Sequence, residues 1–194
     1  MEHEITVEGY GVRLRPIRLS DAAFVHGLRR TPELAKFIGD TDPRLEKQVE
    51  WLEQYFQRDG DYYFIVETLS QKPLGTIGIY NMTDGRAEWG RWVLLPGCHA
   101  APASALLMYR VAFEMLKLRE LYCRTVEQNV KVLSFHDHCG LERTGYERNG
   151  ARIRDEWVNL IVHTARAEEW DKIRKNLHIS AKMAERWLKE EASK

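Results

Sequence analysis

The stretch RAEWGRWVLLPGCHAAPASALLMYRVAFEMLKLRELYCRTV, residues 86–126, decides the fold class of this chain. Arg86 to Leu95 has the composition of a strand and ends at Pro96-Gly97. Ala103 to Leu118 predicts a helix that is apolar on nearly every side and therefore largely buried. Glu120 to Val126 predicts a second strand. A crossover of this kind, through a buried helix, favours parallel neighbours, so we expect the two strands to run parallel.

The segments before this crossover predict one strand, two helices and two further strands. Val12 to Ile17 alternates apolar and basic side chains, and Ser20-Asp21 offers a cap for a following helix. A second helix over residues 45–56 repeats apolar residues at spacings of four, three and four. Tyr62 to Thr68 and Leu74 to Tyr80 predict strands joined by short turns to each other and to residue 86 onward. Short turns make these three strands antiparallel neighbours.

The segments after the crossover predict a short helix and two closing strands. Asn129 can cap a helix that runs through Cys139 and that Gly140 ends. Leu141 to Tyr146 and Trp157 to Thr164 have the composition of strands. The predicted fold class is therefore α+β, with a mixed, mainly antiparallel sheet and helices on both faces.

Two C-terminal helices, Ala167 to Leu177 and Ser180 to Glu191, complete the predicted elements. We expect residues 1–177 to form one domain and residues 178–194 to form a helical extension of it. The apolar residues Met183, Trp187 and Leu188 of that extension either cover the protein's own core or form a homodimer contact.

Composition narrows the class of partner. The 194 residues include 29 basic and 29 acidic side chains. This balance argues against strong electrostatic binding to nucleic acid or to an anionic membrane. The three scattered cysteines, Cys98, Cys123 and Cys139, are not a disulfide framework, and they favour a reducing, cytoplasmic setting. His136, His138 and Cys139 could suggest a metal, but residues two apart on a helix, such as His136 and His138, point in different directions, so we expect no shared metal.

Three segments, in order, resemble the GCN5-related N-acetyltransferase (GNAT) superfamily. Residues 86–90 resemble the start of the fourth strand in the branch that acetylates amino sugars, polyamines and ribosomal protein N-termini. Residues 111–116 resemble the end of that branch's cofactor helix. Residues 129–141 resemble the signature Asn-x-x-Ala-x-x-x-Tyr-x-Lys-x-Gly-Phe, with His136 at the Tyr position and His138 at the Lys position.

The resemblance implies a fold, a donor and an acceptor. The fold is the GNAT sheet, splayed between its fourth and fifth strands, and the donor is acetyl coenzyme A. The pair Phe135-His136 is a feature of the branch that acetylates nucleotide-linked 4-amino-dideoxy sugars. We therefore expect a small-molecule amine of that class to attack the thioester directly. The alternatives are a polyamine or protein N-terminal acetyltransferase of the same fold, or a non-catalytic binding protein that kept the fold.

The resemblance also implies where the cofactor binds. The pantetheine arm would enter the gap between the splayed strands, and backbone amides before the long helix would hold the pyrophosphate. The family's Gln/Arg-x-x-Gly-x-Gly/Ala loop falls on Gly97-Cys98-His99. If the helix starts later, the loop falls on Ala101-Pro102-Ala103 instead. Neither segment keeps the basic residue or both glycines of the family's motif. The expected cofactor-binding residues are Val93, Leu94, Leu95, Gly97, Cys98, His99, Ala100, Ala101, Asn129 and Phe135.

Two side chains are candidate catalysts. His136 lies on or beside the inward stripe of its helix, which by spacing alone indicates a core histidine. The resemblance places it where the family's Tyr faces the cofactor sulfur, so we expect it to donate to the leaving thiolate. Glu88 is either a base that takes the ammonium proton or a strand-end carboxylate paired with Arg86 or another basic residue. The expected substrate-binding residues are Trp89 and Trp92, on opposite faces of one strand, and Tyr80.

Overall fold

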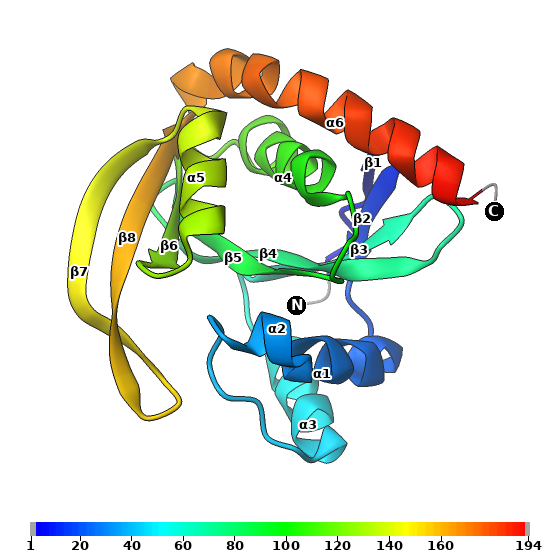
Figure 1. Cartoon of the computed structure of the whole chain (residues 1–194), viewed down its shortest axis with the longest axis vertical. Helices are drawn as coiled ribbons and strands as arrows, with labels where there is room; N and C mark the ends of the chain where they lie inside the picture. Colours follow the sequence, from blue (N-terminus) through cyan, green and yellow to red (C-terminus); the bar gives the residue numbers. More distant parts are fainter. Residues whose placement is uncertain (1–2, 193–194) are drawn as a thin grey trace.

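The predicted crossover lies in the middle of an eight-stranded sheet whose order is β1-β2-β3-β4-β5-β6-β8-β7 (Figure 1). The computed structural model describes residues 3–192, so residues 1, 2, 193 and 194 of the predicted domain and its extension lie outside the described residues. The strands are β1 (Val7–Gly9), β2 (Val12–Pro16), β3 (Tyr62–Thr68), β4 (Pro73–Thr83), β5 (Arg86–Leu94), β6 (Glu120–Val126), β7 (Glu142–Ile153) and β8 (Glu156–Arg166). The α-helices are α1 (Ala22–Arg30), α2 (Pro32–Ala35), α3 (Leu45–Tyr55), α4 (Ala101–Arg110), α5 (Val130–Cys139) and α6 (Trp170–Ala192).

Strands β5 and β6 are parallel, as the crossover predicted, and the other neighbouring strands are antiparallel. Their pairing begins with Arg86 opposite Glu120 and ends with Glu88 opposite Tyr122. Beyond that point both strands continue, β5 to Leu94 and β6 to Val126, without pairing to each other. The sheet is therefore splayed at this place, and both strands present unpaired backbone edges there.

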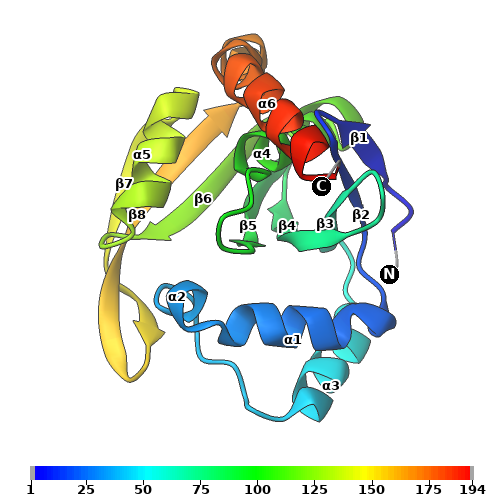
Figure 2. The same cartoon turned by 45° about the vertical axis from the view of Figure 1, so that its right-hand side comes forward.

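Helices cover the two faces of the sheet unequally. Helices α1, α2 and α3 lie below the sheet, and α4, α5 and α6 lie above it (Figures 1 and 2). The larger core lies under α4 and α6, and a smaller core lies where α1 and α3 pack on β3. No helix among residues 3–192 is both long and apolar enough to cross a lipid bilayer.

The inward face of α3 differs from the predicted stripe. Of the apolar residues predicted to share that face, only Leu52 is fully buried, and Leu45 is exposed. The buried residues are Gln48, Leu52 and Tyr55. The Tyr55 hydroxyl accepts a hydrogen bond of 3.0 Å from the backbone N–H of Tyr63, so a tertiary contact rotates the helix toward Tyr55.

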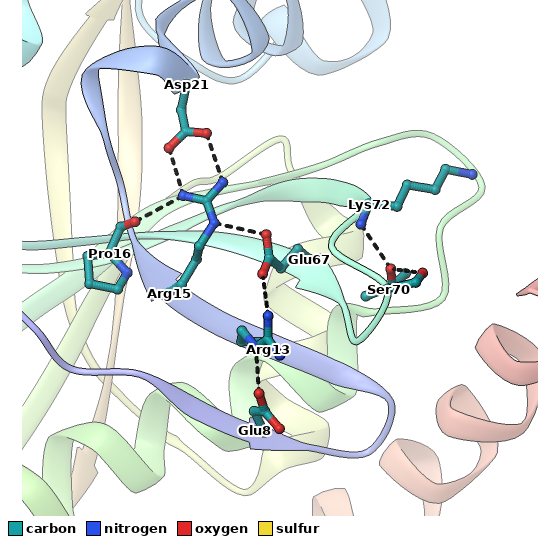
Figure 3. Close-up of polar contacts among 9 residues, drawn as sticks. Glu8, Arg13, Arg15, Pro16, Asp21, Glu67, Ser70 and Lys72 are labelled. Carbon is teal, nitrogen blue, oxygen red and sulfur yellow. Dashed lines mark hydrogen bonds and ion pairs between the residues drawn. The ribbon is translucent and has the colours of Figure 1, made fainter.

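An ion network joins β1, β2 and β3 to the first helical turn (Figure 3). Glu67 of β3 is 2% exposed and accepts from Arg13 Nη1 at 3.1 Å and from Arg15 Nε at 2.9 Å. Arg15 also donates to both carboxylate oxygens of Asp21, each at 2.8 Å, and Arg13 donates to Glu8. The arginines of this network compensate the buried charge of Glu67. An unpaired charge at this position would lower the stability of the fold.

The C-terminal region forms one long α-helix, preceded by a short 3-10 turn at Ala167–Glu169, where two helices were predicted. The residues between the predicted helices do not break it, because its buried row continues through them: Ile173, Leu177, Ala181, Ala184 and Leu188. The expected boundary between residues 177 and 178 falls inside α6. Leu188 covers the protein's own core, whereas Met183 and Trp187 are exposed. The homodimer expected from this helix stays a prediction.

Other predicted bounds differ at their ends. The crossover helix ends at Arg110 and continues as a π-helical turn to Met115 (η2), so Leu118 lies outside it. Strands β7 and β8 are longer than predicted and turn at Arg154 and Asp155, both with positive φ. The missed part, residues 147–156, is polar and largely exposed on this hairpin, so apolar alternation does not mark it.

Candidate active site

A bulge in β5 re-aims the side chains at the splayed edge. Arg91 has a φ of 49°, and the pairing of β4 with β5 shifts between Thr76 and Gly78. The extra residue changes the alternation of the strand. Trp89 and Trp92, predicted on opposite faces, therefore lie together, with ring centroids 5.4 Å apart. Trp89 is 1% exposed and packs under α4 and α5.

His136 lies in this aromatic cluster and is 2% exposed. Its ring centroid is 5.2 Å from that of Trp89, 6.3 Å from that of Trp92 and 5.8 Å from that of Phe135. Burial, and secondly the nearby His163, lowers the pKa of His136 to about 3. The imidazole is therefore neutral near pH 7 and offers one N–H donor.

A second buried histidine, His163 of β8, faces His136 at a ring-centroid distance of 5.2 Å. The sequence analysis missed this residue. His163 is fully buried, and its Nε2 lies 3.1 Å from Oδ1 of Asp137. The Asp137 carboxylate also accepts from Nε and Nη2 of Arg143, which lowers its pKa to about 2. A lone histidine inside the apolar strand Leu160–Ala165 was the available signal, but nothing in the sequence indicates that it faces His136.

Glu88 is 4% exposed and lies on the other face of β5. Oε1 accepts from Arg124 Nε at 3.0 Å and from the Tyr80 hydroxyl at 3.3 Å. Oε2 accepts from Arg124 Nη2 at 3.1 Å and from Asn81 Nδ2 at 3.1 Å. The basic partner of Glu88 is thus Arg124, whereas Arg86 pairs with Glu120.

The two candidate catalysts lie on opposite sides of the sheet where β5 and β6 part. Successive residues of a strand alternate between its faces, so Glu88 and Trp89 point oppositely. The ring of Trp89 contacts His136, and Glu88 is also the last residue of β5 that pairs with β6. A group held in this gap would have a carboxylate on one side and an imidazole on the other.

A groove of about 600 Å³ opens on the Glu88 side. The formal charges of the arginines and glutamates in its lining cancel. These residues are Arg86, Arg124, Arg166, Glu88, Glu120 and Glu147. It also includes Tyr122, whose ring lies 4.2 Å below the guanidinium of Arg86, and Tyr146, which is 55% exposed. The groove therefore offers aromatic surface and arginines without a net negative charge.

A second pocket, of about 380 Å³, borders Trp51, Tyr63 and Arg91 on the same face. Arg91 lies over the rings of these two aromatic residues and of Tyr80, and it pairs with Asp61. Tyr80 lines neither this pocket nor the groove, and the same holds for Trp89 and Trp92. Burial raises the pKa of Tyr80, so its hydroxyl stays protonated and donates to Glu88.

The loop before α4 is the segment predicted to hold the pyrophosphate, and its Cys98 N–H already donates to the carbonyl of Leu95 at 3.1 Å. The helix starts at Ala101, so residues 97–100 precede its N-terminus, where backbone N–H groups lack intrahelical partners. Gly97 has a φ of 75°, and no heavy atom lies within 4 Å of the position a Cβ would take. Ala100 is fully buried, and His99 stacks on Trp187 of α6 with ring centroids 4.9 Å apart.

Three further cofactor candidates lie at or near the β5–β6 gap. The N–H of Leu95 donates to the carbonyl of Leu74 at 2.8 Å, so this amide is already used within the sheet. Val93 is 5% exposed. Asn129 starts α5 through its backbone carbonyl, which accepts from Val132 and Leu133; the predicted side-chain cap is wrong, because that side chain makes no capping hydrogen bond.

Comparisons with known proteins agree with this geometry. The family model of the acetyltransferase (GNAT) domain matches residues 12–142. The apo structure of FdhC, described as a nucleotide-linked sugar GNAT, is 25% identical over 89% of this chain and 96% of its own, with a TM-score of 0.74. A probable GNAT acetyltransferase from Chromobacterium violaceum is 20% identical over 88% and 96%, with a TM-score of 0.78.

A mutant of the spermidine N-acetyltransferase SpeG from Vibrio cholerae is 16% identical, over 84% of this chain and 97% of its own, with a TM-score of 0.74. Identities of 16% and 20% show a shared fold alone. The sequence has no significant match among curated proteins.

Proposed function

The chain belongs to the acetyltransferase (GNAT) domain family, and we propose that it acetylates the amino group of a nucleotide-linked amino sugar. Membership makes the chain an N-acetyltransferase, rather than a non-catalytic binding protein of the same fold. The acceptor class rests on one observation, the tyrosine- and arginine-lined groove that opens at Glu88. The likeness to FdhC at 25% identity supports the same class.

Acetyl coenzyme A is the acyl donor that the family implies, and the residues present fit it. It supplies an acetyl thioester whose carbonyl carbon an amine attacks. The unpaired edges of β5 and β6 offer backbone N–H and C=O groups to the extended pantetheine arm of the cofactor. Leu94 lies on the part of β5 that does not pair with β6. The open space at Gly97 and the small residues Ala100 and Ala101 let backbone amides approach a pyrophosphate.

The two buried catalytic candidates have different tasks. All four of the usual acceptor directions of Glu88 receive protein donors, so one donor must give way before Glu88 can take the proton of the attacking amine through a water molecule. The Tyr80 hydroxyl makes the longest of these bonds, at 3.3 Å. His136 donates a hydrogen bond from its ring N–H to the departing thiolate. Its low pKa keeps it neutral, and the surrounding aromatic rings exclude bulk water, which strengthens the hydrogen bond.

The groove suits a nucleotide sugar better than a polyamine. A polyamine carries several positive charges and would bind an excess of carboxylates, but the glutamates of this lining are paired with arginines. A nucleotide sugar needs cationic donors for its phosphates and an aromatic face for its base. The exposed ring of Tyr146 provides the aromatic face. The three arginines of the groove are the cationic donors, and each would exchange a glutamate partner for phosphate.

Mass spectrometry of the products tests the acceptor class. The enzyme is incubated with acetyl coenzyme A and a panel of nucleotide-linked 4-amino sugars, spermidine and peptides. We expect an acetylated nucleotide sugar as the main product. Acetylated spermidine or peptide with no acetylated sugar would contradict the proposal.

A pair of variants localises the acceptor. Tyr146→Ala should raise the KM for the nucleotide sugar about tenfold, the typical worth of one stacked base, with little change in the KM for acetyl coenzyme A. Trp157→Ala is the matched control, because Trp157 is an aromatic residue of similar exposure on the same hairpin, 63% against 55%, but does not line the groove. Equal effects of the two variants would remove Tyr146 from the binding site.

A further inference from the structure

The hydroxyl of Tyr80 lies against the backbone of β5 at the place where β5 parts from β6. Tyr80 of β4 and Glu88 of β5 are directly opposite each other. Gly90 follows two residues later, on the part of β5 that no longer pairs with β6. A Cβ added at Gly90 would clash with the Tyr80 hydroxyl oxygen. The hydroxyl therefore occupies space beside the gap that a glycine leaves open.

The ring of Tyr80 is held in place, whereas its hydroxyl hydrogen can turn. The guanidinium of Arg91 lies 4.3 Å from the ring centroid. Arg91 is itself fixed, because its Nη2 donates to Oδ2 of Asp61 at 2.9 Å and both side chains are largely buried. A hydroxyl hydrogen rotates about its C–O bond. The Tyr80 hydroxyl can therefore change its acceptor without any movement of the ring.

The present acceptor of this hydroxyl is Oε1 of Glu88, at 3.3 Å. Hydrogen bonds between two oxygen atoms usually span about 2.5–3.0 Å, so this bond is weak. Oε1 also accepts from Arg124 Nε at 3.0 Å, and Oε2 accepts from Arg124 and Asn81. If the Tyr80 hydrogen turns away, Glu88 keeps three donors and gains one open acceptor direction on Oε1.

Tyr80 acts as a donor and not as a base. Burial, and secondly the negative charge of Glu88, raises the pKa of Tyr80, and the other charged groups around the ring are Arg91 and Arg124. The hydroxyl therefore keeps its proton near pH 7. It lies between the groove, which Glu88 lines, and the second pocket, which Arg91 lines.

Attack on a thioester requires a further donor besides the two catalytic candidates. Negative charge develops on the carbonyl oxygen, and a preorganised donor at that oxygen is often the largest single contribution to catalysis. Glu88 serves the amine, and His136 serves the sulfur on the other side of the sheet. The Tyr80 hydroxyl borders the same gap from the Glu88 side, and its hydrogen is the one that Glu88 holds least strongly.

We propose that Tyr80 is a third catalytic residue, whose hydroxyl turns from Glu88 to the carbonyl oxygen of the acetyl group as negative charge develops there. This inference rests on the proposed function. The lone pair of the amine nitrogen forms the bond to the carbonyl carbon, and one electron pair of the C=O bond moves onto the oxygen. That pair returns as the carbon–sulfur bond breaks, and the electron pair of the broken bond leaves on sulfur.

The protons balance in this scheme. The proton that the amine nitrogen loses passes through a water molecule to Oε1 of Glu88, in the direction that the Tyr80 hydrogen has left, and then to solvent. Tyr80 keeps its own proton throughout. A protonated carboxyl is itself a donor, and the phenolic oxygen can accept from it. Protonation of Glu88 and the turn of the Tyr80 hydrogen toward the gap therefore support each other.

Tyr80→Phe tests the role of the hydroxyl. The variant keeps the ring that Arg91 covers and loses only a long hydrogen bond, so it should fold. We expect kcat to fall about 100-fold, with the KM for acetyl coenzyme A nearly unchanged, because the donor acts in the transition state. The loss should stay constant from neutral to alkaline pH, unlike the loss in Glu88→Gln.

Two kinetic outcomes would overturn the proposal. An unchanged or higher kcat in Tyr80→Phe would mean that the hydroxyl only occupies Glu88. A loss that eases at high pH would mean that Tyr80 acts through Glu88. Tyr55→Phe is the matched control and should leave kcat within twofold of wild type, because the Tyr55 hydroxyl bonds to the backbone N–H of Tyr63 in the smaller core. The kinetics use whichever amine of the panel gives product, so a wrong acceptor class would not affect them.

Binding of two cofactor analogues provides a readout without turnover and without an amine. Acetonyl coenzyme A carries a plain ketone in place of the thioester. Trifluoroacetonyl coenzyme A carries a ketone that adds water readily and so presents a tetrahedral carbon with an acidic hydroxyl. Calorimetry should show that the wild type binds the trifluoroketone about 100-fold more tightly than the plain ketone. Tyr80→Phe should reduce this preference about tenfold, the typical worth of one hydrogen bond to a charged group.

The analogue experiment separates the two levels of the argument. If both analogues bind but the wild type has no preference, or if Tyr80→Phe keeps the full preference, the role of Tyr80 is overturned and the cofactor site stands. If neither analogue binds the wild type, the cofactor site of the proposed function is overturned, and the role of Tyr80 with it.

Discussion

Two buried glutamates, Glu67 of β3 and Glu88 of β5, have the same chemistry but different surroundings. Their exposed fractions are 2% and 4%, and each is held by arginine. Strand β3 is paired along both edges, to β2 and to β4. The pairing of β5 with β6 ends at Glu88, and a groove opens there. Burial and ion pairing are therefore alike in the two glutamates, and access from an unpaired edge is the feature that sets Glu88 apart as the proposed base.

The largest expected effect is on catalysis at the open side of the sheet. His136→Phe should preserve the fold, because Phe has a similar size and joins an aromatic cluster. It should lower kcat by about 10²–10³-fold, since one preorganised hydrogen-bond donor to the developing negative charge is lost. Steady-state kinetics and a thermal melt measure the two quantities. Near wild-type kcat in the folded variant would leave His136 as a packing residue, and direct aminolysis without a side-chain acid would then be the better mechanism.

Glu88→Gln should come next, with kcat lowered about 100-fold near pH 7. The loss should ease at high pH, because more of the acceptor amine is already neutral there. Glu67→Gln is the matched control and should leave kcat within twofold of wild type. A flat ratio of wild-type to Glu88→Gln kcat across pH would show that Glu88 orients Arg124 and Tyr80 rather than accepting a proton.

Glu67→Gln should instead reduce stability. Removing the charge leaves Arg13 and Arg15 with weaker partners, and breaking a buried ion pair costs about 3 kcal/mol. The free energy of unfolding from denaturant titration measures this change. Glu8→Gln, which alters the exposed end of the same network, should cost less than about 1 kcal/mol. Equal costs for the two variants would mean that the buried position of Glu67 adds nothing.

The smallest expected effect concerns acid stability. The pKa of His136 is about 3 in the folded protein against 6.5 for the ordinary side chain, so the unfolded chain binds a proton first as the pH falls. The stability associated with neutral His136 is fully present above pH 6.5 and declines from there toward pH 3. The decline approaches roughly 1.4 kcal/mol per pH unit.

His136→Phe lacks this contribution, so between pH 6.5 and 5.5 its free energy of unfolding should fall by about 1 kcal/mol less than that of the wild type. Denaturant titrations at several pH values measure both slopes. Parallel slopes for the two proteins would show that His136 titrates in the folded state as it does in the unfolded chain.

Local pattern was enough to predict most elements. The strands Tyr62–Thr68 and Glu120–Val126 were predicted to the residue, because compact apolar runs bounded by turns mark buried strands. The end of α5 was also confirmed, since Gly140 takes the left-handed conformation with a φ of 84°. The hairpin of β7 and β8 was only half predicted, because residues 147–156 are mostly polar and show no apolar alternation.

The sequence by itself determined the α+β class, the parallel crossover, the family and the candidacy of His136 and Glu88, because each follows from local spacing or from an ordered motif. Only the tertiary structure decided that Trp89 and Trp92 share a face. The bulge depends on a positive φ at Arg91, and an arginine in the sequence does not indicate a positive φ. The tertiary structure also decided that Glu88 pairs with Arg124 and that His163 faces His136. Contacts between distant elements depend on how strands pair and helices pack, and the periodicity of a single segment carries no record of its partner.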